Sequence, residues 1–176
     1  MRIVALALAL ALPSAALATG GHDAVGCEGC HSMHTARGEL IFALPPNTTV
    51  VDPRTDKPLG VLSALCLSCH AEAAEGGRGV APVSHHLGHP FSLGKVNPRL
   101  AKVPPELLRG GRFECVGCHD PHPSNPNYRY LRIAVSRTPT LSELCSVCHP
   151  RKADPDTRAT PLFSSMDERA ERAPPP

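Results

Sequence analysis

The sequence predicts a mostly irregular fold with short α-helices, in which something other than side chains fills the core. Side chains that could build a core are scarce, because the 176 residues include only 4 Phe, 2 Tyr and no Trp. The 20 Pro and 14 Gly interrupt regular structure throughout the chain. A domain of this length normally buries a sizeable side-chain core, so the composition argues against a self-sufficient enzyme domain, a Rossmann domain, a membrane bundle or a large β-sandwich.

The placement of the cysteines suggests what fills the core. All 8 cysteines belong to four runs of the form C-x-x-C-H. Eight cysteines and ten histidines placed at random would give far fewer than one such run. The pairs are Cys27 and Cys30, Cys66 and Cys69, Cys115 and Cys118, and Cys145 and Cys148, followed in turn by His31, His70, His119 and His149.

This spacing suits the covalent attachment of haem c. Each thiol adds to one vinyl group of the porphyrin, and the histidine binds its iron. Residues at i, i+3 and i+4 share one face of a helical turn, so a single turn can present both sulfurs and the imidazole. The sequence therefore predicts four covalently attached haem c groups, each with the histidine of its own motif as proximal ligand, and a haem-filled core.

Disulfides and zinc sites are the alternative interpretations of these cysteines. An exported chain with an even number of cysteines often forms disulfides, and C-x-x-C pairs with nearby histidines can bind zinc. Neither alternative requires a histidine directly after every second cysteine, so haem attachment is preferred.

Residues 1–18 have the features of an export signal. Arg2 precedes an apolar run over residues 3–12, and Ala16 and Ala18 provide a small-residue cleavage site before Thr19. The run is too short to span a bilayer, so we expect no membrane span in the mature chain. An uncleaved short anchor is the alternative. Export to the periplasm or beyond the cell agrees with haem attachment, which normally takes place outside the cytoplasmic membrane.

Two of the four motifs lie on segments with helical patterns. Residues 61–75 carry apolar residues, cysteines and His70 at helical spacing and end at Gly76. Thr140 and Glu143 form a capping-box pattern, which predicts a helix that carries Cys145 to His149 and ends at Pro150.

The chain also repeats itself. Cys27 and Cys115, like His34 and His122, are 88 positions apart, whereas Cys66 and Cys145 are 79 apart. We therefore expect a first dihaem unit over residues 19–75, a joint over 76–84, a second dihaem unit over 85–150 and a disordered tail over 151–176.

The net charge gives no support for nucleic acid as a partner, and none is expected. The formal charge is +2, and it includes Arg2 of the export signal. The propionates of four haems would turn the charge of the mature protein negative, and the chain has no basic run and no phosphate-binding loop.

The motifs, in order, resemble those of the doubled C-x-x-C-H multihaem cytochromes c of respiring bacteria. The matching features are C-x-x-C-H-x-x-H ending at His34, Leu-C-x-x-C-H at Cys66 and Cys145, the run from Ser84 to Pro90, and C-x-x-C-H-Asp-Pro-His ending at His122. The resemblance covers nearly the whole mature chain. It implies a periplasmic or extracellular electron carrier, and it implies His89 as the sixth ligand of the third haem. Some members of the family polymerise into conductive filaments.

Sixth ligands are expected to be histidines. Met33 lies two residues from His31 and Met166 lies in the tail, so bis-His ligation is expected at all four irons, with lower potentials than His-Met ligation. We expect His34 on the second haem, His122 on the fourth, His89 on the third and His22 on the first. His85 and His86 are further candidates with no assigned role.

These features predict an electron carrier and not an enzyme. Redox partner proteins are expected, although the sequence identifies neither the donor nor the acceptor. Two alternatives remain open: a filament-forming subunit that self-associates, and a small multihaem reductase with one open iron.

Overall fold

The protein is described here by a computed structural model, which covers residues 21–37, 40–53, 55–83, 99, 101–135, 142–149 and 162–165. The expected export signal, His85, His86 and His89, and the Thr140 and Pro150 ends of the last predicted helix lie outside these residues.

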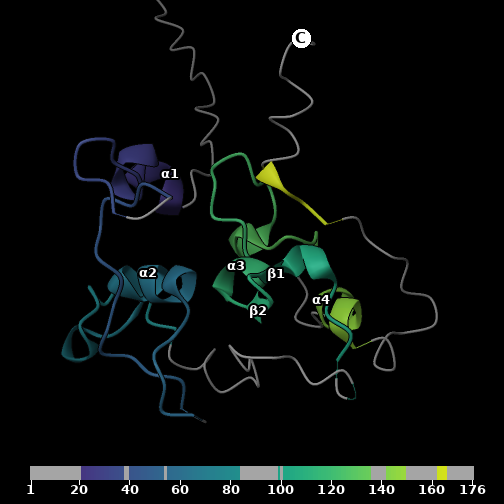
Figure 1. Cartoon of the computed structure of the whole chain (residues 1–176). Helices are drawn as coiled ribbons and strands as arrows, with labels where there is room; N and C mark the ends of the chain where they lie inside the picture. Colours follow the sequence, from purple (N-terminus) through teal and green to yellow (C-terminus); the bar gives the residue numbers. More distant parts are fainter. Residues whose placement is uncertain are drawn as a thin grey trace, which may run out of the picture.

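Regular structure within the described residues is sparse, which confirms the prediction of a mostly irregular chain with short helices (Figure 1). Several elements are single turns, and the antiparallel pair β1–β2 pairs Leu108 with Phe113 and Arg109 with Arg112. No helix among the described residues is long and apolar enough to cross a membrane. The elements in order are α1 (Gly21–Val25), η1 (Cys27–Gly29), α2 (Val61–His70), η2 (Ala73–Glu75), η4 (Pro105–Leu107), β1 (Leu108–Arg109), β2 (Arg112–Phe113), α3 (Cys115–Cys118), η5 (Tyr128–Tyr130) and α4 (Ser142–Cys148).

The helix expected over residues 61–75 is divided into two pieces. Helix α2 ends at His70, Ala71 is extended, and η2 forms one further turn closed by Gly76 at φ 78°. The carbonyls of Cys69, His70 and Ala71 accept hydrogen bonds from Val80, Val83 and Gly79 instead of from the next helical turn. Residues 79–83, which run back along the end of the helix, therefore occupy the carbonyls that a longer helix would need as acceptors.

Helix α2 packs against α3, which comes from the second half of the chain (Figure 1). The buried Glu114 carboxylate accepts the backbone N–H of Ser63 at 2.8 Å, in the first turn of α2. The Ser63 hydroxyl in turn accepts the backbone N–H of Cys115 at 3.2 Å. A negative charge at the N-terminus of a helix is favourable, so Glu114 acts as a remote cap that ties the halves together.

The side-chain core is small. Among the described residues, one buried cluster consists of Leu59, Leu67 and Ala71, with Val50 and Val83 packed against it. Further buried apolar side chains lie outside this cluster: Phe42, Ala64, Leu107, Phe113, Leu131 and Ile133. Several large apolar side chains, among them Val61 and Met33, are instead exposed. Within the described residues, side chains alone provide little of the buried apolar surface that usually stabilises a domain.

Residues 162–165 lie inside the predicted disordered tail but are packed against the second half. The backbone N–H of Phe163 donates to the carbonyl of Arg132, and the Arg132 guanidinium donates to the carbonyl of Phe163 at 3.0 Å. Ser165 is buried. Arg132 and Asp120 thus supply hydrogen-bond partners for the backbone of Phe163 and Ser165.

Candidate haem-binding sites

The four C-x-x-C-H motifs occupy helical turns in the structure. The second and fourth motifs lie on α2 and α4, as the helical patterns predict, whereas the first and third lie on the single turns η1 and α3. In the first, third and fourth motifs the backbone N–H of the histidine donates to the carbonyl of the first cysteine, at 2.8 to 3.0 Å. This i to i+4 bond brings the histidine back over the face that carries the cysteines.

All eight cysteines are among the described residues, and all are free thiols. Each of these cysteine residues is at least partly exposed. Three of the four histidines that follow the cysteine pairs have Nδ1 within hydrogen-bond distance of a backbone carbonyl. Nδ1 lies 3.0 Å from the Leu40 carbonyl in His31, 3.4 Å from the Ala81 carbonyl in His70 and 2.9 Å from the Arg129 carbonyl in His119.

A carbonyl can only accept a hydrogen bond, so in each of these pairs Nδ1 carries the proton. The lone pair is then on Nε2, which is the arrangement that a metal-binding histidine uses. The cysteines and histidines of the motifs therefore fit the attachment and axial ligation of haem.

The segments that supply these carbonyls have the same local geometry in the first and third motifs. His31 bridges to Phe42 and His119 bridges to Leu131. A residue with positive φ directly follows each acceptor carbonyl, Ile41 at φ 48° in the first motif and Tyr130 at φ 57° in the third. Non-glycine residues rarely adopt this backbone region, so its recurrence at equivalent places indicates a shared loop geometry that holds the proximal histidine.

The cysteine pairs are arranged as a row that follows the order of the sequence. Burial raises the pKa of Cys30, and the nearby Cys69 raises it further. A hydrogen bond between the thiols of Cys66 and Cys115 raises the pKa of Cys66 and lowers that of Cys115 to about 7. Burial raises the pKa of Cys118 to about 12, with a further contribution from Cys148. Each motif thus lies beside the next one.

The candidate sixth ligands within the described residues differ in their surroundings. His34 is exposed, and its backbone N–H lies 3.3 Å from the Ser32 hydroxyl. His122 lies in a network of polar contacts, and His22 lies against the ring of His70. The structure does not describe His89.

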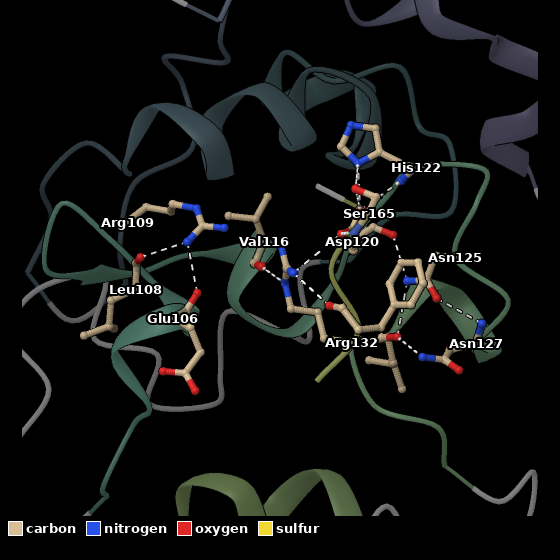
Figure 2. A network of polar contacts seen from close by, with 12 residues as sticks. Glu106, Leu108, Arg109, Val116, Asp120, His122, Asn125, Asn127, Arg132 and Ser165 are labelled. Atoms are coloured by element: carbon tan, nitrogen blue, oxygen red, sulfur yellow. Dashed lines mark hydrogen bonds and ion pairs between the residues drawn. The ribbon is translucent and has the colours of Figure 1, made fainter. Parts of the chain in front are cut away.

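Asp120 is a residue at this site that sequence analysis missed (Figure 2). Its carboxylate is buried, and Oδ1 lies 2.7 Å from Nδ1 of His122. Ser165 donates to the same carboxylate through its backbone N–H at 2.8 Å and its hydroxyl at 3.0 Å. Arg132 lies 3.5 Å from Oδ2. The acidic residue between His119 and His122 was a visible signal, because Ser32 stands at the equivalent place in the first motif.

Burial alone would raise the pKa of Asp120, but its hydrogen bonds from Ser165 and His122, with the charge of Arg132, hold that pKa below its usual range. The carboxylate therefore stays ionised and keeps the proton of His122 on Nδ1, which leaves Nε2 free for a metal. The Ser165 hydroxyl lies 2.8 Å from Nδ1 of His122, the nitrogen that also contacts Asp120. The three side chains therefore do not form a catalytic triad, in which the serine and the carboxylate contact opposite nitrogens.

Paired cysteines on helical turns, each pair followed directly by a histidine, are the attachment signature of c-type haem. Comparison with known proteins agrees. Residues 108–154 match the family described as the doubled CXXCH motif, which confirms the resemblance over the third and fourth motifs. The motif is a site of covalently bound haem c.

The chain is also similar to the C-type cytochrome OmcS of Geobacter sulfurreducens, with 29% identity over 117 residues. The similarity covers 64% of this chain and 24% of the relative, so the chain spans about a quarter of the length of that protein. No solved structure matches the chain.

Proposed function

We propose that the protein is a tetrahaem c-type cytochrome that carries electrons in bacterial respiration, in the periplasm or outside the cell. The observation that carries the proposal is the row of four cysteine pairs, in which Cys30 lies near Cys69, Cys66 contacts Cys115, and Cys118 lies near Cys148. Porphyrins attached at neighbouring pairs would be close together, which favours transfer of electrons from one iron to the next.

The haem irons supply the redox chemistry, since each cycles between two oxidation states. The chain attaches the porphyrins through its eight cysteines and binds each iron with a proximal histidine. Four further histidines are assigned as sixth ligands: His22, His34, His89 and His122. Bis-His ligation keeps the potentials low. The repeat divides the chain into two dihaem units, at residues 19–75 and 85–150. The porphyrins fill the core, to which the side chains contribute little.

The partners under this proposal are redox proteins that deliver and remove electrons. An export signal over residues 1–18 and covalent haem attachment support a location outside the cytoplasmic membrane. Self-association into a filament is an alternative that particle size would reveal by light scattering or electron microscopy.

The stoichiometry tests the proposal. Pyridine haemochrome analysis and intact mass of the exported protein should give four haems on a chain that begins at Thr19. Fewer than four covalent haems, or zinc in their place, would contradict it.

His122→Ala should open the sixth position of the haem attached to Cys145 and Cys148. His122 lies only three residues after His119, on chain that has already left helix α3, so this short link does not easily let His122 reach the far side of its neighbour's porphyrin. All four haems should stay attached, while one becomes high-spin by electron paramagnetic resonance. Assigned haem-methyl NMR signals should place the change on the fourth haem.

Ser165→Ala is the matched control for this variant. It removes a hydroxyl 2.8 Å from Nδ1 of His122 but keeps the imidazole, so all four haems should remain low-spin. A response of the haem on Cys115 and Cys118, or no response in His122→Ala, would show that the assignment is wrong.

A further inference from the structure

Two histidines that are far apart in the sequence lie next to each other in the structure, with their rings tilted. The ring centroids of His22, in α1, and His70, at the end of α2, are 5.9 Å apart, and the ring planes are inclined by 59°. His70 is the proximal histidine of the second motif, and His22 precedes the first motif. Sequence analysis assigned His22 to the first haem, so this contact was unexpected.

The separation suits two imidazoles that share one metal ion. Metal–nitrogen bonds of about 2.0–2.1 Å on opposite sides of an ion place the two ring centroids roughly 6 Å apart. Rotation about the shared axis is unrestricted, so an inclination of 59° between the rings is compatible with this arrangement.

His22 is also oriented as a ligand. Its Nδ1 lies 3.1 Å from the carbonyl of Pro121, which can only accept, so Nδ1 carries the proton and Nε2 keeps its lone pair. The proximal histidines show the same bond, including Nδ1 of His70 to the carbonyl of Ala81.

The second half of the chain holds this orientation. The ring of His22 stacks on that of Tyr130, with centroids 4.9 Å apart and planes 15° apart. The backbone N–H of His22 donates to the Tyr130 hydroxyl at 3.2 Å. Pro121 and Tyr130 therefore fix both the backbone and the ring of a residue that lies about a hundred positions earlier in the chain.

We propose that His22 is the sixth ligand of the second haem, the one attached to Cys66 and Cys69. This inference rests on the proposed function. It replaces the expectation of His34 at the second haem and of His22 at the first. The second haem is then a junction between the halves, because its proximal ligand comes from the first half while the second half positions its distal ligand.

A pair of double variants tests the proposal with the full-length holoprotein. His22→Ala and His70→Ala should each perturb one haem, as counted by the fraction of high-spin iron in electron paramagnetic resonance. Because both histidines bind the same iron, the double variant His22→Ala/His70→Ala should still perturb one haem. The matched control is His34→Ala/His70→Ala. In this control the second haem should be perturbed as it is in His70→Ala alone, because His34 does not bind its iron.

The outcomes separate the inference from the proposed function. Two perturbed haems in the His22/His70 double variant, or four low-spin haems in His22→Ala, would overturn the inference while the haem count still supported a tetrahaem cytochrome. Absence of covalent haem from the wild type would overturn the function itself.

Should His70→Ala prevent haem attachment, the wild-type protein provides a second measurement. Nuclear Overhauser effects in the oxidised protein should connect the ring protons of His22 and of His70 to the methyl groups of one haem. Connections to two different haems would contradict the proposal.

Discussion

Asp120→Ala is expected to lower the free energy of unfolding by about 3–5 kcal/mol, the usual cost of removing one partner from a buried ion pair. The variant removes a buried negative charge from beside the guanidinium of Arg132, 3.5 Å away, and leaves the backbone N–H of Ser165 without its acceptor. Thermal unfolding of the holoprotein, followed by far-ultraviolet circular dichroism, would measure the loss.

The same variant should loosen two neighbouring parts of the site. Residues 162–165 lose the carboxylate that binds Ser165, and His122 loses the acceptor at 2.7 Å that fixes its ring. Asp120→Asn is the matched control, because it keeps the shape and one acceptor oxygen while it removes the charge. A loss in Asp120→Ala no larger than in an exposed-site variant would show that this network does not stabilise the fold.

Leu67→Ala is expected to destabilise the holoprotein by about 2–5 kcal/mol, the range for truncating a buried leucine. Leu67 is 2% exposed and lies between the two cysteines of the second motif, in a cluster with Leu59 and Ala71. The cluster is small, so few neighbouring side chains can move to fill the space. Denaturant unfolding would measure the change.

Val61→Ala is the control for Leu67, since both side chains lie on α2 but Val61 is 61% exposed. Its effect should be within about 0.5 kcal/mol, as is usual for exposed positions. Equal effects of the two substitutions would mean that the side-chain cluster contributes little beside the haems.

The second and fourth motifs show which features of a helix the local sequence pattern can predict. The spacing of apolar residues and cysteines predicted α2 and α4, because both elements depend on contacts within a few residues of one another. The same pattern placed the end of the first helix at Gly76, yet α2 ends at His70. The carbonyls that would continue it are taken by residues 79–83, a competition that helical periodicity does not reveal.

The candidate site divides in the same way. The attachment cysteines and the proximal histidines were predicted from the sequence, because attachment chemistry demands a fixed spacing within five residues. Asp120 was missed, since its importance depends on Arg132 and on Ser165, 45 residues later in the chain. The partner of His22 could not be predicted either, because nothing local connects a residue before the first motif with Pro121 and Tyr130.

The sequence by itself therefore determined the four C-x-x-C-H motifs and a mostly irregular chain, and it predicted the histidine after each cysteine pair as a proximal ligand. Tertiary structure alone decided which motifs are neighbours, which carbonyls orient the histidines and which histidine faces His70. The physical reason is distance along the chain. Thioether attachment and helical turns are local, whereas an axial ligand and the hydrogen bonds that orient it can come from any segment that folding brings within a few ångströms.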